Sequence, residues 1–398
     1  MGNRKPTITI LYQEIFQKVL VAKEIANLRF MPTLKYGASV ERVAYDISSV
    51  RVRSVTRGSA STVDSVTDSS ELLTINLEKE AVFHISDGEA TQTGPLNPGE
   101  VIGAQVAVKV AVDLDGRFFN EVLNAAYTFD TGDLTTLSST GVPFAESSTT
   151  VPQMVSMMPA KLRRNNQMLS NLCFVTDSFG AGLMTQYLLG KSIDLAGSVY
   201  ANGYAGDVSN AQMYVSENLT GTAELFLNTQ PTDGDTVSVN GIIFTYKTVL
   251  GATPGNVLIG ANAAAARANL VALINAPGTT TAQGVALSAA NQVALTDTYK
   301  ITATDVIAST KMTIAGIGSG ALTVAETLTA VADVWSKNCV HAYFGKKGAV
   351  DMVVQDLKEV DMRETADRRG TNVFSSYLAG IKTFTDGSKK FLNVLLAR

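Results

Sequence analysis

Apolar and polar residues alternate over residues 74–85, a period of two that predicts a β-strand. The apolar positions, interrupted only by Lys79, are Ile75, Leu77, Ala81, Phe83 and Ile85. The opposite face is polar apart from Val82 and carries Asn76, Glu78, Glu80 and His84. We therefore expect one face of this strand to lie on a core and the other to face solvent.

A second pattern, with helical spacing, predicts one long helix that starts at Asn97-Pro98-Gly99-Glu100. This tetrapeptide offers an N-cap, a proline at the first helical position and a glutamate three residues after the cap. The apolar residues on one side are Ala104, Val108, Ala111, Val112, Phe119, Val122 and Ala126. About thirty residues at 1.5 Å each would make a rod of roughly 45 Å. Gly116 and many valines lower the helix propensity, so packing must stabilise this helix.

The pattern over residues 39–73 predicts a long β-hairpin that precedes the strand predicted at residues 74–85. Residues 40–56 form one extended arm, residues 58–70 a tip rich in Ser, Thr, Gly and Asp, and residues 72–83 the return. Isolated two-stranded hairpins are marginal in water, so we expect this one to lie on a neighbour. The alternative is a loose surface loop.

Residues 1–57 form a basic arm, with a short amphipathic helix expected at Leu11, Ile15, Val19 and Ala22. Its basic residues either meet DNA phosphates or lie across an acidic surface of the same or a neighbouring subunit, and the second interpretation is favoured.

After a linker at 131–150, the pattern predicts a helix over 155–169 with Pro159 near its start. A buried strand over 172–175 follows, and then a helix capped by Asp177 or Ser178 that ends at Gly190. We expect a turn at 203–206 and a strand at 212–216.

Composition changes at Thr220, and up to Asp333 Ala, Thr and Gly dominate. Asn240-Gly241 between residues 236–239 and 242–246 is a strong hairpin signal. A helix is expected over 261–276, with strands at 293–295, 301–303 and 312–314. This stretch predicts a small self-contained domain inserted into a host domain. The host resumes with strands at 339–344 and 350–354, and residues 377–383 and 390–396 flank a turn at Asp386-Gly387.

The amino-acid composition and net charge exclude some classes of function. The 398 residues are 45% hydrophobic and only 17% charged, against a usual quarter, which suggests extensive burial within the chain or against copies of it. A net charge of −4 argues against a general nucleic-acid binder. Cys173 and Cys339 lack a CxxC spacing and are interpreted as buried hydrophobes in a reducing compartment, with a disulfide or metal site as the weaker alternative. Without a signal peptide or an 18-residue apolar run, we expect a soluble protein made in a cytoplasm.

The inventory of catalytic residue types is small. His84 and His341 lie in predicted strands and are interpreted as structural. Asp113 and Asp115 lie on opposite faces of the long helix, which does not suit shared acid–base chemistry. Asp233-Gly234-Asp235 lacks the further ligands of a calcium loop, and the glycines at 316–320 lack the lysine of a phosphate loop. We predict no catalytic, cofactor-binding or metal-binding residues, no cofactor and no enzymatic activity.

Several segments carry a resemblance to a known family. They are Leu-Glu-Lys-Glu-Ala-Val-Phe-His-Ile-Ser-Asp-Gly-Glu (77–89), Asn-Leu-Cys-Phe-Val-Thr-Asp-Ser-Phe-Gly-Ala-Gly-Leu (171–183), Gly-Tyr-Ala-Gly-Asp (203–207), Met-Tyr-Val-Ser-Glu-Asn-Leu (213–219), His-Ala-Tyr-Phe-Gly-Lys-Lys-Gly-Ala-Val (341–350) and Gly-Ile-Lys-Thr-Phe-Thr-Asp-Gly-Ser-Lys (380–389). In this order they resemble the major capsid proteins of tailed bacteriophages with the Hong Kong 97-type fold. The resemblance covers residues 1–219 and 334–398. Residues 233–241, Asp-Gly-Asp-Thr-Val-Ser-Val-Asn-Gly, are similar to the start of a small β-rich domain of phage virion proteins.

The resemblance implies an α+β fold with five parts. These are an N-terminal arm (1–38), an extended loop lying on the neighbouring subunit (39–73), a peripheral domain with a spine helix (74–130), an axial domain with returning peripheral strands (150–219 and 334–398), and an inserted domain on the outer surface (221–333).

It also implies a function: self-assembly into hexamers and pentamers of an icosahedral shell around double-stranded DNA. The implied partners are copies of the chain, portal and scaffolding proteins, a decoration protein on the outer face, and packaged DNA by weak non-specific contact, with no membrane. Assembly would occur in the cytoplasm of a host bacterium. Three alternatives stay open: an encapsulin-like compartment shell, a phage tail or surface protein built of β-modules, and an enzyme that depends on His84 or His341.

Overall fold

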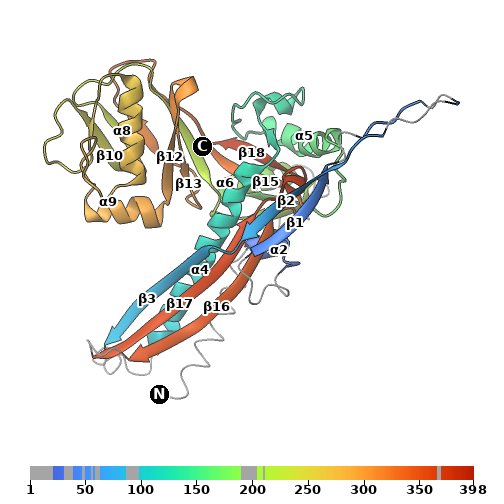
Figure 1. Cartoon of the computed structure of the whole chain (residues 1–398), viewed down its shortest axis with the longest axis horizontal. Coiled ribbons are helices and arrows are strands. Elements are labelled where there is room, and N and C mark those ends of the chain that lie inside the picture. The colour runs from blue at the N-terminus through green and yellow to red at the C-terminus, as the bar shows by residue number, and fades with distance from the viewer. Residues whose placement is uncertain are drawn as a thin grey trace.

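The computed structural model describes residues 21–30, 39–46, 50–54, 57–58, 63–86, 98–189, 204–208, 211–364 and 369–398. Helices and sheets are both present, as the α+β expectation requires. Most of the predicted N-terminal arm lies outside these residues, as do the cap Asn97, the helix stop at Gly190 and the first residue of the turn expected at 203–206. Figure 1 shows an elongated sheet and helix at one end, a hairpin that projects from the other, and a lobe formed by the inserted residues.

A three-stranded antiparallel sheet in the order β16-β17-β3 forms the elongated part. Its strands are β3 (Leu77–Ser86), β16 (Asp351–Glu364) and β17 (Gly370–Lys382). Helix α4 (Pro98–Asn120) lies along one face, so Leu77, Ala81 and Phe83 pack with the helix core as the alternation predicts. The buried helix residues of this core include Val110, Leu114, Phe118 and Phe119. The strand begins at Leu77 rather than at residue 74, because the hairpin strand ends at Thr74.

The long helix is shorter than the apolar pattern predicts. Helix α4 has 23 residues, which at 1.5 Å each make about 35 Å. The chain then tightens into the 3₁₀ turn η1 (Glu121–Asn124) and extends into β4 (Tyr127–Phe129), which pairs with β18 (Phe391–Ala397). This strand pairing takes the place of the last helical turn, although Val122 is buried as expected.

Gly116 in α4 is explained by tertiary packing. A Cβ atom at Gly116 would lie 2.8 Å from the Cα of Gly318, closer than side-chain carbons approach. The glycine that weakens the helix therefore lets a turn of the inserted segment approach the helix backbone.

The central nine-stranded sheet continues from the host part of the chain into the inserted residues. Its strands follow the order β12-β13-β8-β15-β5-β7-β6, with β18 paired to β15 and to β4. Their bounds are β5 (Leu172–Thr176), β6 (Tyr204–Val208), β7 (Ala211–Val215), β8 (Gly221–Phe226), β12 (Ile301–Val306), β13 (Lys311–Gly316) and β15 (Trp335–Lys346). The turn expected at 203–206 is wrong, because Tyr204–Val208 pairs with β7 as an edge strand, where glycine is tolerated.

Two helices pack beside this sheet: α5 (Thr150–Arg164) and α6 (Ser178–Leu189). The expectation that α5 starts near Pro159 is wrong, since the helix begins nine residues earlier and contains the proline. The expected end at residue 169 is also wrong, because the chain leaves the helix after Arg164 and Asn166 adopts a φ of 59°. Asp177 caps α6, as predicted, by accepting a hydrogen bond from the Gly180 N–H at 2.9 Å. The short helices η2 (Thr131–Leu134) and α10 (Thr385–Ser388) complete this part, and α10 occupies the predicted turn at Asp386-Gly387.

The inserted residues carry their own apolar core and a four-stranded sheet in the order β11-β10-β9-β14. The elements are β9 (Thr236–Val239), β10 (Ile242–Lys247), β11 (Asn256–Leu258), α8 (Ala263–Asn275), α9 (Ala289–Val293), the π-helical turn η4 (Ala294–Thr298), η5 (Ile307–Ser309) and β14 (Val324–Glu326). The hairpin at Asn240-Gly241 is confirmed, with φ values of 49° and 80°. The strand expected at 293–295 is wrong: the Ser288 side chain caps a helix there by accepting from the Asn291 N–H.

Candidate self-assembly surface

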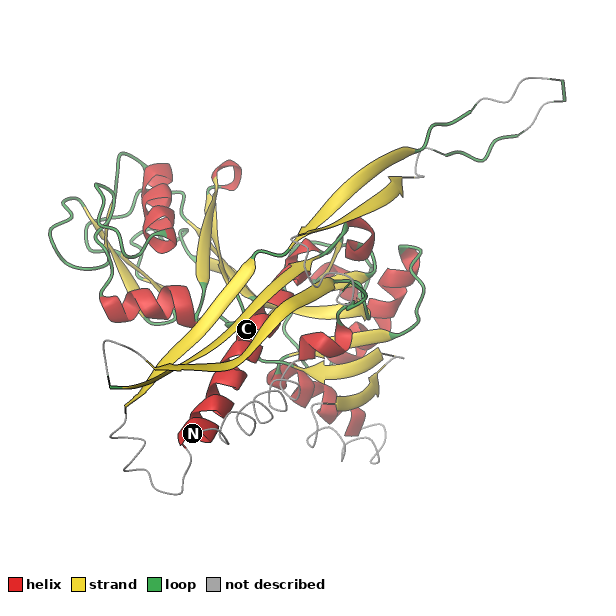
Figure 2. Ribbon diagram, turned by 60° about the horizontal axis from the view of Figure 1, so that its bottom comes forward, coloured by secondary structure: helices red, strands yellow, loops and turns green. Residues whose placement is uncertain are grey.

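A two-stranded hairpin, β1 (Ser39–Asp46) and β2 (Thr67–Thr74), projects from the middle of the molecule (Figure 2). Its root is anchored by apolar packing, because Leu73 and Ile75 are buried against Val353 and Phe384. Val40 is directly opposite Leu73 in the hairpin and packs against the same cluster. One face of the hairpin root therefore belongs to the core of its own subunit.

Polar contacts fix both strands of the root to α10. Arg42 on β1 donates from Nη2 to the Asp386 carboxylate at 2.6 Å, and its guanidinium lies over the Phe384 ring. Glu71, directly opposite Arg42, accepts from the Thr385 N–H at 3.0 Å. Lys382 donates to the Leu72 carbonyl at 2.7 Å. The direction of the hairpin is set by the body of the subunit.

Beyond the root, the hairpin exposes apolar side chains that the described part of its own subunit leaves uncovered. Val52 is fully exposed at 105% and Val63 almost fully at 89%, and Val43, Val50 and Val66 are about half exposed. Asp64 joins the two sides of the tip by pairing with Arg51 at 3.2 Å and with Arg53. A hairpin with exposed valines and no core of its own gains stability from a partner that covers it.

The segment 21–30, which includes α2 (Val21–Ile25), is held to the body by two buried carboxylates. Asp115, on α4, accepts from the Ala22 N–H at 2.9 Å and the Val21 N–H at 3.3 Å. Asp351 accepts from the Asn27 side-chain amide at 2.6 Å. Burial raises the pKa of each carboxyl to about 6, although these donors favour the ionised form.

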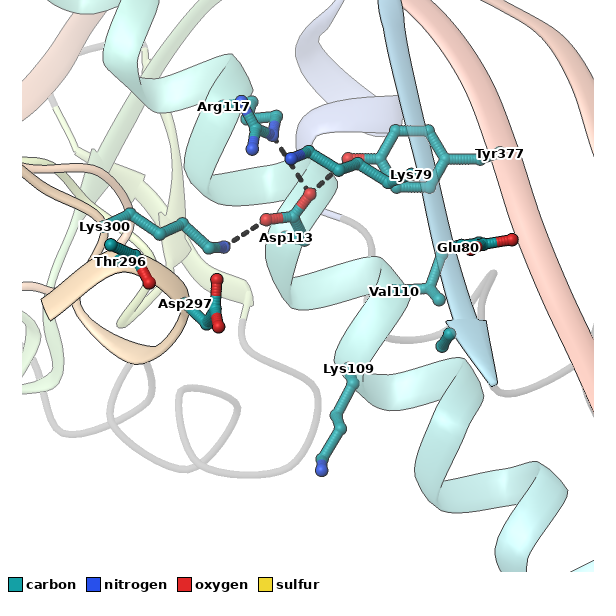
Figure 3. Close-up of a pocket in the computed structure, with 11 residues that line it drawn as sticks. Lys79, Glu80, Lys109, Val110, Asp113, Arg117, Thr296, Asp297, Lys300 and Tyr377 are labelled. Carbon is teal, nitrogen blue, oxygen red and sulfur yellow. Dashed lines mark hydrogen bonds and ion pairs between the residues drawn. The ribbon is translucent and has the colours of Figure 1, made fainter. Parts of the chain in front are cut away.

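Asp113 faces the inserted residues, on the side of α4 away from Asp115. Its carboxylate accepts from Arg117 Nε at 3.0 Å, from the Tyr377 hydroxyl and from Lys300 of the inserted segment (Figure 3). Burial opposes the ionised form, but the Lys300 and Tyr377 hydrogen bonds outweigh it and lower the pKa of Asp113. A pocket of about 430 Å³ lies beside this junction and is lined by β3, α4, β17 and the residues around η4. We conclude that Asp113 ties the insert to the spine helix.

His341 and Cys339 were interpreted separately from the sequence, but their side chains lie close together in the structure. The Asn393 side-chain oxygen is 2.8 Å from His341 Nδ1, which assigns the ring proton to Nδ1, so that Nε2 accepts from the Thr222 hydroxyl at 2.7 Å. Cys339 Sγ lies 3.8 Å from Nε2. Cys339, His341 and Asn393 are thus arranged like the nucleophile, base and orienting group of a catalytic triad. However, burial lowers the pKa of His341 to about 4 and raises that of Cys339 to about 11, so the pair is not suited to this chemistry. The cluster therefore joins β8, β15 and β18 as a structural element.

We expect both thiols to resist modification in the native protein. Burial raises the pKa of Cys173 to about 12 and that of Cys339 to about 11, so neither forms a thiolate at pH 8. A thiol-reactive disulfide reagent should label neither cysteine at pH 8 and should label both in denaturant. Fast native labelling of Cys339 would contradict the structural assignment and favour a reactive centre.

The remaining candidate residues have structural partners. His84 Nδ1 lies 2.7 Å from the Asn372 side-chain oxygen of the paired strand. Asp233 accepts from Thr248 and Lys247, and Asp235 from Thr232 and Thr329. Within the described ranges, no group of three or more His, Cys, Asp or Glu residues is placed to hold a metal ion. The helices in these ranges also include none that is long and apolar enough to span a membrane.

No family model matches the sequence, and no curated protein matches it. The chain is similar to a solved structure from Mycobacterium phage Che8, with 12% identity, a TM-score of 0.51 and coverage of 94% of this chain and 90% of that one. Weaker likenesses are to a structure from Mycobacterium phage Ogopogo (12% identity, TM-score 0.48, 95% and 92% coverage) and to the capsid structure of Cyanophage P-SCSP1u (12% identity, TM-score 0.45, 91% and 84% coverage). The likeness to the Che8 structure shows that the two chains share a fold. The α+β architecture of Hong Kong 97 type expected from the sequence is thus confirmed.

Proposed function

We propose that this protein is the major capsid protein of a tailed phage, a structural subunit that assembles with copies of itself into an icosahedral shell around double-stranded DNA. The observation that carries the proposal is the projecting hairpin. Its root is fixed by Leu73, Arg42 and Glu71, whereas valines such as Val52 and Val63 stay uncovered within the subunit. Such an element is stable when a neighbouring copy covers it.

Composition and charge support the same proposal. Only 17% of the residues are charged and the net charge is −4, which suits extensive contact between copies and avoids strong adhesion to packaged DNA. Many weak contacts per subunit become strong through multiplicity. We assign no enzymatic step, because the cluster at His341 is buried and its pKa values do not suit a nucleophile–base pair.

The proposed parts follow the sequence boundaries. Residues 1–38 are the arm, 39–73 the extended loop, 74–130 the peripheral domain, 150–219 and 334–398 the axial domain with returning strands, and 221–333 the inserted domain on the outer surface. The separate core of the inserted residues supports treating them as a unit. Hexamers and pentamers, portal and scaffolding proteins, a decoration protein and weak contact with DNA are the proposed partners, within a virion assembled in the host cytoplasm.

Expression of the chain alone, followed by mass measurement with light scattering and negative-stain electron microscopy, tests the function. We expect closed angular particles or rings of five and six subunits. Rods or fibres would instead favour a tail or surface β-module protein. Closed shells that co-purify with an enzyme cargo would favour an encapsulin-like compartment.

A further inference from the structure

Lys79 is the only polar side chain at the apolar positions of β3. Its neighbours on the same face, Leu77, Ala81 and Phe83, pack against the core that includes α4. Lys79 is exposed and lines the pocket of about 430 Å³, and Figure 3 shows it extending from β3 toward α4. No ion pair to Lys79 occurs among the side chains that the structure describes. The strand therefore brings a positive charge to the pocket at a position where the alternation predicts an apolar residue.

Helix α4 brings two more cations to the same pocket. Lys109 and Arg117 are eight residues apart with Asp113 midway, so the three side chains share one face of the helix. All three line the pocket. Lys109 is exposed and, within the described ranges, forms no ion pair. Arg117 is held in place, because its Nε donates to the Asp113 carboxylate at 3.0 Å and only 20% of its side chain is exposed.

The inserted residues form another wall of the pocket. Lys300 extends from the insert and pairs with Asp113, and the turn η4 before it contributes Thr296 and Asp297. The backbone of Lys300 is left-handed, with a φ of 48°, a conformation that is uncommon for a residue with a Cβ atom. Backbone outliers of this kind cluster at functional sites, ligand-binding sites among them. The pocket is therefore built jointly by host residues and by the insert.

The charges that line the pocket do not balance. The cations are Lys79, Lys109, Arg117 and Lys300, whereas the carboxylates are Asp113 and Asp297. Glu80 also contributes to the lining, but its side chain points to the other side of β3 (Figure 3). Four cations against two carboxylates leave a net charge of +2, and a concave site concentrates the potential of such charges. The pocket is suited to an anion.

We propose that this pocket binds a small molecule that carries one or two phosphate groups. A phosphate monoester has a charge of about −1.5 to −2 at pH 7, which offsets the charge of the lining. Arginine and lysine are the side chains that bind phosphate, and the planar guanidinium of Arg117 offers paired donors to its oxygens. The volume of about 430 Å³ lies near the lower end of the range for small-molecule sites, so a compact anion fits better than a segment of a partner protein.

The bound anion would join two parts of the subunit. Lys109 belongs to the spine helix and Lys300 to the insert, so a ligand that contacts both stabilises the arrangement in which they meet. Because such a ligand binds the folded chain and not the unfolded one, it raises the melting temperature as its concentration increases. This inference goes beyond the proposed shell function, since the site lies within a single subunit.

Calorimetric titration of the unassembled full chain with inorganic pyrophosphate at low salt tests the site. We expect saturable binding at one site per subunit, a higher melting temperature with the ligand, and weaker binding as sodium chloride is added. Lys79→Met and Lys109→Met should each weaken binding about tenfold, because each removes one charge-assisted contact to the anion. The double variant should show no measurable binding, whereas Lys79→Arg, which keeps the charge, should retain most of it.

Lys389→Met is the matched control. It removes the same charge from an exposed lysine beside α10, outside the pocket, and should leave the affinity unchanged. Because Lys79 and Lys109 are exposed, their variants should melt at the wild-type temperature without ligand. Absence of saturable binding to the wild type, or equal weakening by Lys389→Met and Lys79→Met, would overturn the site and leave the shell function standing. Binding of a short DNA duplex or of hexaglutamate that pyrophosphate does not displace would overturn the assignment to a small phosphate compound.

Discussion

Replacing residues 50–66 with a short Asn-Gly turn should abolish closed shells while leaving a folded subunit. The replaced residues carry the exposed Val52 and Val63 and the Asp64 ion pairs but no member of the root cluster. The remaining strands β1 and β2 keep their contacts to α10 and Phe384, so the free energy of unfolding should change by less than about 1 kcal/mol. We expect light scattering to show monomers or capsomers in place of particles.

A variant of the root provides the contrast. Leu73→Ala removes a fully buried side chain that packs with Val353 and Phe384, and should cost about 2–5 kcal/mol of folding stability. Loss of assembly in that variant should therefore come with a lower melting temperature, whereas the tip replacement should lose assembly without it. Normal shells from the tip replacement would contradict the role assigned to the hairpin.

Local patterns in the sequence were sufficient where neighbouring residues decide the structure. The alternation around Leu77 and Phe83 identified which face of β3 meets the core, and Asn240-Gly241 identified a hairpin because both residues tolerate positive φ. Competing local signals caused the errors. The apolar run at 293–295 resembles a strand, but the Ser288 cap starts a helix just before it.

Contacts between distant residues could not be predicted from one sequence. From the sequence alone, Gly116 is predicted only to weaken the helix. In the structure, Gly318, about two hundred residues later in the chain, occupies the space that a side chain at Gly116 would fill. The two aspartates of α4 were placed on opposite faces, yet nothing local indicated that Asp113 would meet Lys300 or that Asp115 would hold Ala22. The uncovered tip was predicted from the low stability of isolated two-stranded hairpins in water.

The pH dependence of stability should report the Asp115 contact. Burial raises the pKa of this carboxyl from 3.8 to about 6, so the folded subunit binds the proton more tightly than the unfolded chain does. Its contribution to stability is fully present below pH 3.8 and is lost as the pH rises through about 6. Two pKa units at about 1.4 kcal/mol each make this loss about 3 kcal/mol. The Asp115→Asn variant has no ionisable group at this position. Its free energy of unfolding should therefore rise by about this much relative to that of the wild type as the pH increases from 4 to 8.

His341 supplies a control of opposite sign. Its pKa is lowered by burial from 6.5 to about 4, so its contribution is present above pH 6.5 and is lost as the pH falls toward 4. His341→Gln should remove that loss on acidification, although it also disturbs the Thr222 and Asn393 contacts at every pH. Denaturant unfolding of both variants in the tip-replaced background keeps assembly out of the measurement. Parallel stability curves for the wild type and Asp115→Asn between pH 4 and pH 8 would show that Asp115 is not held as a buried, proton-binding contact to the N-terminal segment.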